Sequence, residues 1–460
     1  METIIRALHA SCGASGRRMV VAVTGGGLSG ASLLLSVPGA SQTILEVTCP
    51  YSRLSFSDYI SPAPLPSSLA SEAAALSLGR ASLARARSLC LRDRDIIGAS
   101  LAVGLGASAA LVSSAPRAGT HRCHVALCSH EKEEVWSVVL DKGARERNDE
   151  EMVCGHLVVG AAASSIGLLT NDGGGGPISG MKMLMGDKLR EGDQLTFTSS
   201  IVPSPLERLL VPSEGKVGEA LSHVFFPPFS PACPLPNAPL SFLTTSKQEG
   251  RASPKLVILS GSFNPLHRGH KALGAAAVAA LSRSYPTEQP PPLLVYELSA
   301  LNVDKPPLSV IEVTRRLAPF LEGGETPHID SPWHGGVVVT KCPTFMQKAA
   351  LFPGAAFAVG WDTAARIVSP RYYEGGREGM VRALTGLMRS GTVLLVGGRR
   401  AGAAPLPPDW EGHHPDSPLQ FLTLEKHILP SVPAILHSLF LGISEGEFRE
   451  DISSTALRGL

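Results

Sequence analysis

A pair of histidines stands near the middle of the chain, in the segment Gly261-Ser262-Phe263-Asn264-Pro265-Leu266-His267-Arg268-Gly269-His270. An apolar run precedes the segment and an alanine-rich stretch follows it, which predicts a strand, a tight turn at Asn264-Pro265 and a helix. His267 and His270 then share a face at the start of that helix, where backbone amides attract phosphate. A phosphoryl group in transfer needs positioning and hydrogen-bond donors more than a protein nucleophile. The segment therefore predicts a phosphate-transfer site, and the alternative is a proline-stiffened turn with two surface histidines.

A second group of anion-binding side chains occupies residues 452–458, with the sequence ISSTALR. Ser453, Ser454 or Thr455 can cap a short helix and present hydroxyls and amides to a phosphate. Arg458 follows on the same face, where its guanidinium can hold a triphosphate through two hydrogen bonds. The alternative is a helix cap with a solvated arginine.

Two further segments carry candidate ligand contacts. Lys305 lies in a loop after the second strand, where it can meet a substrate phosphate or remain solvated. Gly360, Trp361 and Asp362 follow the fourth strand. Asp362 can bind a sugar hydroxyl or cap the next helix, and Trp361 can stack on a ring or fill the core.

The elements that must position these residues alternate regularly. Short apolar runs predict five strands, and helical patterns lie between them. Such alternation predicts a parallel sheet with right-handed crossovers, a Rossmann-like doubly wound α/β domain. The expected strands are 255–260, 293–298, 337–339, 356–359 and 392–396, and the expected helices include 269–284, 309–321 and 363–368.

These motifs together resemble the cytidylyltransferase-like superfamily, and within it the nicotinamide and nicotinate mononucleotide adenylyltransferases, over residues 253–460. The resemblance implies that His267 and His270 act on the transferring phosphate of ATP, which binds with Mg²⁺. It implies nucleotide contacts from the motif and from two later segments, namely Gly261, Ser262, Phe263, Asn264, Gly269, Gly360, Asp362, Ser453, Ser454, Thr455 and Arg458. The sequence departs from the family at Trp361, where a small residue is usual, and at Tyr372 and Tyr373, near which the family has a tryptophan.

The N-terminal part of the chain has a different resemblance. Thr24-Gly25-Gly26, residues 37–41 and Pro50-Tyr51-Ser52 resemble the C-terminal domain of the CinA competence-damage proteins, which hydrolyse the amide of nicotinamide mononucleotide. The family's serine and lysine positions correspond to Ala22 and Phe56. Because the chemistry needs a hydroxyl and a nearby base, we expect a CinA-like α/β domain that has lost this activity.

Composition limits the remaining possibilities. A total of 460 residues predicts more than one domain: a CinA-like domain over 1–168, a glycine- and proline-rich linker or insertion over 169–252, and the transferase domain over 253–460. Lysine and arginine number 41 against 40 aspartates and glutamates, so we expect small-molecule substrates rather than nucleic acid. Residues 97–115 carry no charge but read as a buried strand with a glycine turn, so no membrane partner is expected. The cysteines form no close CxxC pair, so no metal site is expected.

The sequence predicts a cytoplasmic enzyme, with organellar targeting left open by Arg6, Arg17 and Arg18 and the oligomeric state left open as well. Its expected reaction moves an adenylyl group from ATP to a phosphorylated small molecule. Nicotinamide or nicotinate mononucleotide is the first acceptor considered; phosphopantetheine or a cytidylyl acceptor is the second. The alternative is a nucleotide-binding sensor or scaffold without turnover. A class I aminoacyl-tRNA synthetase shares the paired-histidine motif but is set aside, because the sequence shows no Lys-Met-Ser-Lys-Ser-like loop and no basic surplus.

Overall fold

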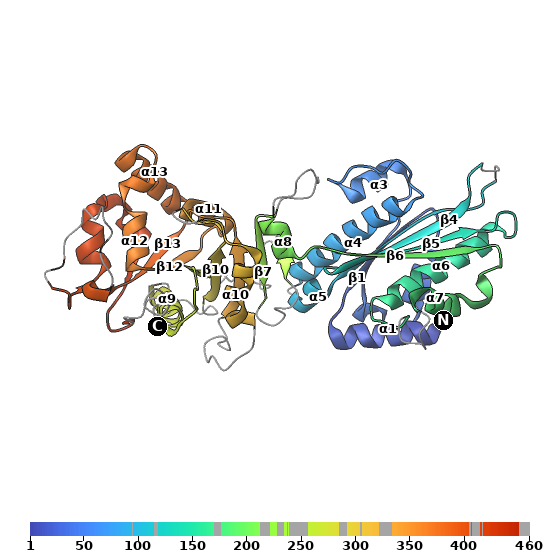
Figure 1. The fold of residues 1–460 in the computed structure, drawn as a ribbon, viewed down its shortest axis with the longest axis horizontal. Helices are drawn as coiled ribbons and strands as arrows, with labels where there is room; N and C mark the ends of the chain where they lie inside the picture. Colours follow the sequence, from blue (N-terminus) through green and yellow to red (C-terminus); the bar gives the residue numbers. More distant parts are fainter. Residues whose placement is uncertain are drawn as a thin grey trace. The chain divides into compact units, whose positions relative to one another are not determined.

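The computed structural model describes residues 1–93, 95–114, 118–169, 176–211, 221–227, 234–236, 238, 256–284, 292–303, 306–321, 334–403, 406, 415 and 417–449. The chain divides into two compact units, Met1–Ser204 and Pro205–Leu460. Each unit is built on its own sheet, with helices on both faces (Figure 1). Both units mix helices with partly parallel sheets, so the predicted α/β fold class is confirmed.

Unit 1 contains a six-stranded sheet in the order β2-β1-β3-β4-β5-β6. The first three strands in this order are parallel, and the other pairings are antiparallel. The strands are β1 (Met19–Thr24), β2 (Ile44–Thr48), β3 (Val103–Ala110), β4 (His121–Cys128), β5 (Lys132–Leu140) and β6 (Gln194–Ile201). The helices are α1 (Glu2–Ser15), α2 (Leu28–Ser36), α3 (Arg53–Ile60), α4 (Glu72–Arg92), α5 (Ile96–Leu101), α6 (Arg147–Ser164) and α7 (Gly176–Met185).

The glycines of the uncharged segment 97–115 have a packing role. Gly104 and Gly106 lie inside β3, not in a turn after a strand as expected. A Cβ on Gly104 would lie 2.1 Å from the carbonyl oxygen of Gly79 in α4. The glycines therefore let a long helix approach the sheet backbone closely.

Unit 2 contains an eight-stranded sheet in the order β16-β13-β12-β9-β10-β11-β7-β8. The six strands from β16 to β11 are parallel, and β7 and β8 extend the sheet in antiparallel fashion. The strands are β7 (His223–Phe226), β8 (Leu235–Pro236), β9 (Leu256–Gly261), β10 (Leu293–Ser299), β11 (His334–Thr340), β12 (Ala356–Gly360), β13 (Val393–Gly397) and β16 (Phe440–Ile443). A separate two-stranded pair is formed by β14 (Arg399–Arg400) and β15 (Phe421–Leu422).

The helices of unit 2 are α8 (Pro205–Leu210), α9 (Arg268–Ser284), α10 (Val310–Leu321), α11 (Phe345–Leu351), α12 (Trp361–Ile367) and α13 (Gly376–Arg389). Leu273 of α9 and Leu317 of α10 share one hydrophobic core with Leu259 and Tyr296 of the sheet. Phe357 of β12 faces the other way, with its ring edge-on to those of two phenylalanines at the ends of α11.

The segment 169–252 contributes to both sheets. Its strand β6 pairs with β5 in unit 1, and its strand β7 pairs with β11 in unit 2. The division between the units falls after Ser204, inside this segment.

Candidate functional site

The histidine segment lies at the topological switch point of the unit 2 sheet. From β9 the chain adds β10 and β11 on one side, and then β12, β13 and β16 on the other. In open α/β sheets, ligands bind outside the carboxyl ends of the strands at the point where the strand order reverses. The ends of β9 and β12 flank that point, so residues 261–270 and 360–362 border the expected binding crevice.

The turn after β9 folds around a buried phenylalanine. Phe263 has φ of 42°, in the left-handed region that non-glycine residues seldom adopt, and is 1% exposed. A Cβ on Gly261 would lie 2.6 Å from the Phe263 ring, so glycine makes room for this ring. Backbone strain of this kind persists only where its surroundings hold it, and it gathers at functional sites.

The two predicted histidines lie against each other at the start of α9. The His267 and His270 rings stack with centroids 3.7 Å apart. The His267 backbone N–H donates to Nδ1 of His270 over 3.3 Å, so the neutral His270 ring carries its proton on Nε2. Burial, together with His267, lowers the pKa of the His270 imidazole to about 3. His270 is therefore a neutral hydrogen-bond donor at physiological pH.

Helix α9 begins at Arg268, one residue before the expected start, and Gly269 is buried within its first turn. The His270 and Lys271 amides donate back to the carbonyl of His267, over 3.0 and 3.5 Å. His267 thus occupies the position that caps the helix. Its ring and the first turn of the helix share one end of α9, the end that attracts anions.

The first turn of α12, directly after β12, supplies a carboxylate held by an arginine. The helix begins at Trp361 and not at the expected residue 363, so Asp362 lies inside it and does not cap it. Nε and Nη2 of Arg399 lie 3.0 and 2.9 Å from Oδ1 of Asp362, which stays 44% exposed. A Cβ on Gly360 would meet no heavy atom within 4 Å, so open space adjoins this strand end. Trp361 is 1% exposed and lies under the Arg399 guanidinium, a position that fits a core side chain better than a substrate contact.

Arg399 was absent from the sequence prediction. It stands in Gly397-Gly398-Arg399-Arg400, directly after the fifth of the predicted strands. A basic residue after a glycine pair at a strand end was the available signal, because the carboxyl ends of parallel strands meet at one edge.

One side chain and one backbone carbonyl of the motif turn are held from α10. Arg315 donates to Oδ1 of Asn264 over 2.5 Å, and Arg316 donates to the carbonyl of Ser262 over 3.0 Å. Glu312 accepts hydrogen bonds from both arginines. Glu312 is not among the site residues that the sequence predicts.

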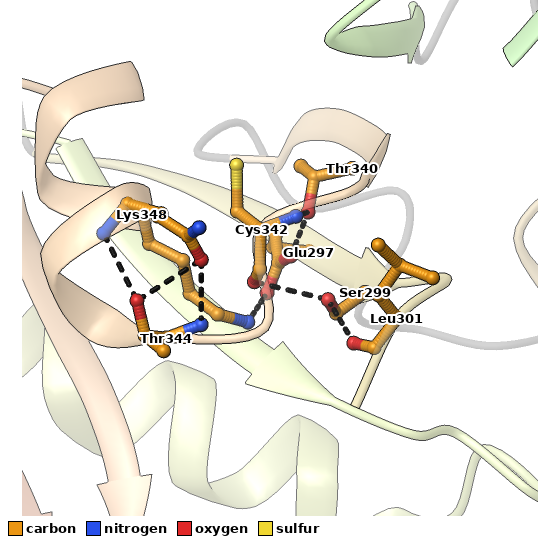
Figure 2. A network of polar contacts seen from close by, with 8 residues as sticks. Glu297, Ser299, Leu301, Thr340, Cys342, Thr344 and Lys348 are labelled. Carbon is orange, nitrogen blue, oxygen red and sulfur yellow. Dashed lines mark hydrogen bonds and ion pairs between the residues drawn. The ribbon is translucent and has the colours of Figure 1, made fainter. Parts of the chain in front are cut away.

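A buried polar network lies at the ends of β10 and β11 (Figure 2). Glu297 is fully buried and accepts from Lys348 and Thr340, each over 2.5 Å. The Thr340 hydroxyl also accepts from the Cys342 amide over 3.2 Å. Glu297 pairs in register with Ser260 of β9, so this network is one strand away from the motif strand.

Five predicted contact residues lie outside the described residues. They are Lys305, Ser453, Ser454, Thr455 and Arg458.

In unit 1, the two positions that correspond to the serine and the lysine of the CinA family hold apolar, buried residues. Ala22 and Phe56 are 0% and 1% exposed and belong to one hydrophobic cluster with residues of α3 and α4. Tyr51 is 67% exposed. Neither Ala22 nor Phe56 offers a nucleophile or a base.

The loop Gly25-Gly26-Gly27 of unit 1, which leads into α2, is hydrogen-bonded to a carboxylate of the same unit. Glu151 accepts from the amides of Gly27 and Ser29 at the start of α2, over 2.8 and 2.9 Å. Amides at a helix start attract anions, and here the Glu151 carboxylate is the anion that they bind. An open hollow of about 510 Å³ lies nearby on unit 1, lined by Val112, Ser113, Ser114, Arg145, Glu146 and Arg147.

Across the described parts of both units, no helix combines the length and apolar character that crossing a membrane requires.

No protein-family model matches the sequence, and no curated protein matches it significantly. Among solved structures, the chain is similar to the competence/damage inducible protein CihA from Agrobacterium tumefaciens, with 15% identity and a TM-score of 0.29 over 36% of this chain and 94% of that one. It is also similar to a competence-damaged protein (CinA) superfamily protein from Escherichia coli, with 18% identity and a TM-score of 0.24 over 36% of this chain and 87% of that one. Values this low establish neither a shared activity nor shared site residues.

Proposed function

We propose that unit 2 is a nucleotidyltransferase that moves an adenylyl group from ATP to a phosphorylated small molecule and releases pyrophosphate. The observation that carries the proposal is the stacked pair of His267 and His270, with a neutral His270, at the switch point of a parallel sheet. Nicotinamide or nicotinate mononucleotide is the first acceptor to test, on the sequence resemblance stated above.

In this reaction an oxygen of the acceptor phosphate attacks the α-phosphorus of ATP, and the bond from that phosphorus to the bridging oxygen breaks. The substrate is ATP with its Mg²⁺. Nε2–H of His270 donates to the phosphate oxygens as charge develops on them, and His267 and the first turn of α9 contribute at the same helix end. A neutral donor suits this task because it pays no cost for holding a charge in a buried position.

The ribose side of the nucleotide belongs beside β12 in this proposal. Open space adjoins Gly360, and Asp362 is exposed enough to accept from a sugar hydroxyl. Arg399 holds the Asp362 carboxylate in one orientation, which reduces the entropy that binding must remove. Arg458 and the hydroxyls of residues 453–455 are proposed, from the sequence, to hold the leaving phosphates.

The test is a pyrophosphate-release screen of the full chain with ATP or CTP against phosphorylated acceptors, including both pyridine mononucleotides and phosphopantetheine. His270→Ala is expected to lower turnover by about two to four orders of magnitude, the range for losing one transition-state donor. The matched control is His437→Gln, because His437 contacts backbone carbonyls of its own loop. ATP binding without release of pyrophosphate for any acceptor would replace the proposal with the sensor or scaffold alternative.

A further inference from the structure

Helix α10 turns a cluster of three charged side chains toward the motif turn. Glu312 accepts from Nε and Nη2 of Arg315, over 2.9 and 2.8 Å, and from Nε of Arg316 over 2.8 Å. The arginine hydrogen bonds, that of Arg315 first, lower the pKa of the Glu312 carboxyl to about 2. Glu312 is therefore ionised at any pH at which the protein works.

The guanidinium groups continue from Glu312 to the turn itself. Arg316, whose side chain is 11% exposed, donates to the backbone carbonyl of Ser262, while Arg315 donates to the Asn264 side chain. These contacts lie on the two sides of Phe263, the residue with the left-handed backbone. A conformation of that kind needs its neighbours to be held in place.

Phe263 in turn contacts the catalytic candidate. Its ring meets the His270 ring edge-on, with centroids 5.1 Å apart. The same Phe263 ring packs edge-on against Phe320 of α10 and Tyr296 of β10, with centroids 5.2 and 5.7 Å away. Helix α10 thus reaches His270 by polar contacts to the turn and by an aromatic contact to Phe263.

We propose that Glu312 is a positioning residue, which aligns Arg315 and Arg316 on the turn at Ser262–Asn264 and so holds Phe263 and the His270 ring in their working orientation. The inference rests on the function proposed for unit 2 but concerns a residue that touches neither substrate nor the reacting atoms.

Glu312 suits this role because of what the arginines would do without it. Two adjacent guanidinium groups repel each other, and each side chain has many rotamers from which to choose. The carboxylate between them neutralises the repulsion and selects one rotamer for each. Orientation errors as small as about 1 Å at a reacting group cost turnover by about 100-fold, so a loosened turn lowers kcat even when the fold survives.

The test compares Glu312→Gln with Glu2→Gln in the full chain. Glu2 forms an ion pair with Arg6, one helical turn away on α1, over 2.6 Å. This pair is the matched control, because it is also within one helix but lies far from the motif in the sequence. For Glu312→Gln we expect kcat to fall about 10- to 100-fold with the KM for ATP changed less than about twofold, because orientation acts in the transition state. Arg316→Lys, which keeps one donor for the Ser262 carbonyl, should retain more activity than Arg316→Met.

A second measurement does not depend on activity. Amide hydrogen exchange of residues 261–270 is expected to become faster in Glu312→Gln and to stay unchanged in Glu2→Gln, with the melting temperature of both variants close to that of the wild type. Unchanged exchange, unchanged kcat, or a lowered melting temperature that accounts for the lost activity would each overturn the positioning role. If the wild-type chain transfers no nucleotide, the proposed function fails, and exchange alone then decides whether Glu312 holds the turn.

Discussion

Replacing Lys348 with methionine removes one partner of the buried network in Figure 2. Lys348→Met keeps the length and apolar stem of the side chain, so packing changes little. It leaves the Glu297 carboxylate, which is fully buried, with the Thr340 hydroxyl as its remaining donor in this network. The variant therefore isolates the cost of an uncompensated buried charge.

The expected loss follows from burial. Breaking a buried ion pair at one partner costs about 3–5 kcal/mol, whereas replacing both charges by apolar groups is often close to neutral. For a unit of this size about 1 kcal/mol corresponds to about 2–4 °C, so Lys348→Met should lower the melting temperature of unit 2 by about 6–20 °C. The double variant Glu297→Leu/Lys348→Met should recover about half of this loss, because the Thr340 hydroxyl left without its acceptor still costs about 1–3 kcal/mol.

Differential scanning calorimetry of the full chain measures both variants. Arg449→Met is the control, since Arg449 and Glu445 form a pair in unit 2 at 2.9 Å with side chains 48% and 43% exposed. Exposed pairs contribute about 0–1 kcal/mol, so this control should shift the transition by a few degrees at most. The reasoning is refuted if Lys348→Met behaves like the control, or if the double variant is no more stable than the single one.

Three further outcomes are expected. The full chain should release no ammonia from nicotinamide mononucleotide, because Ala22 and Phe56 are apolar and buried; release above a buffer blank would contradict this. His270 should titrate near pH 3 by NMR of the free protein, against an ordinary pKa of 6.5. Since folding lowers this pKa, His270 costs no stability above pH 6.5 and destabilises the fold as pH falls from 6.5 toward 3, an effect that His270→Asn should remove; a measured pKa above 6 would exclude it. Deleting residues 453–460 should weaken ATP binding in calorimetric titration and leave the melting temperature of the ligand-free protein nearly unchanged; equal affinities would make this segment an ordinary cap.

Much of unit 2 was predictable because its strands are short apolar runs between helical patterns. The strand predicted at 255–260 is β9 at Leu256–Gly261, and the helix predicted at 269–284 is α9 at Arg268–Ser284. Buried parallel strands read as near-continuous apolar runs, and the short length of these runs between helical patterns favours strands. In unit 1, β1 has the same character, because its residues Val20-Val21-Ala22-Val23 are all apolar and buried.

The strands that escaped prediction lack this signal. β7 and β16 have four residues each, and β7 lies within the proline-rich segment that was expected to be a linker or insertion. β7 takes its place in the sheet by pairing with β11, and β16 by pairing with β13. The two strands of each pair are far apart in the sequence. Long-range pairing of this kind is decided by tertiary packing, which local periodicity does not contain.

The candidate site shows the same division. His267 and His270 could be named from their spacing, but their stacking and the low pKa of His270 arise from burial that only the fold creates. Arg399 and Glu312 hold Asp362 and the motif turn from elements far along the chain. The glycine pair before Arg399 marks a strand end but not its partner, and Glu312 stands in no recognisable motif, since each supports another side chain through contacts that no short spacing encodes.

The start of α2 in unit 1 and the start of α9 in unit 2 carry different side chains, and the difference bears on which of the two helix starts is able to bind a phosphate. In unit 1 the amides of Gly27 and Ser29 receive the chain's own Glu151 carboxylate, which satisfies them without a ligand. In unit 2 the start of α9 carries two stacked imidazoles, and burial keeps His270 neutral. A carboxylate at a helix start completes the fold and repels an incoming phosphate, whereas a neutral donor leaves that helix end able to attract one. The nucleotide chemistry that we propose for this chain is therefore to be tested first at His270 in unit 2, because in unit 1 the amides of Gly27 and Ser29 already have Glu151 as their acceptor.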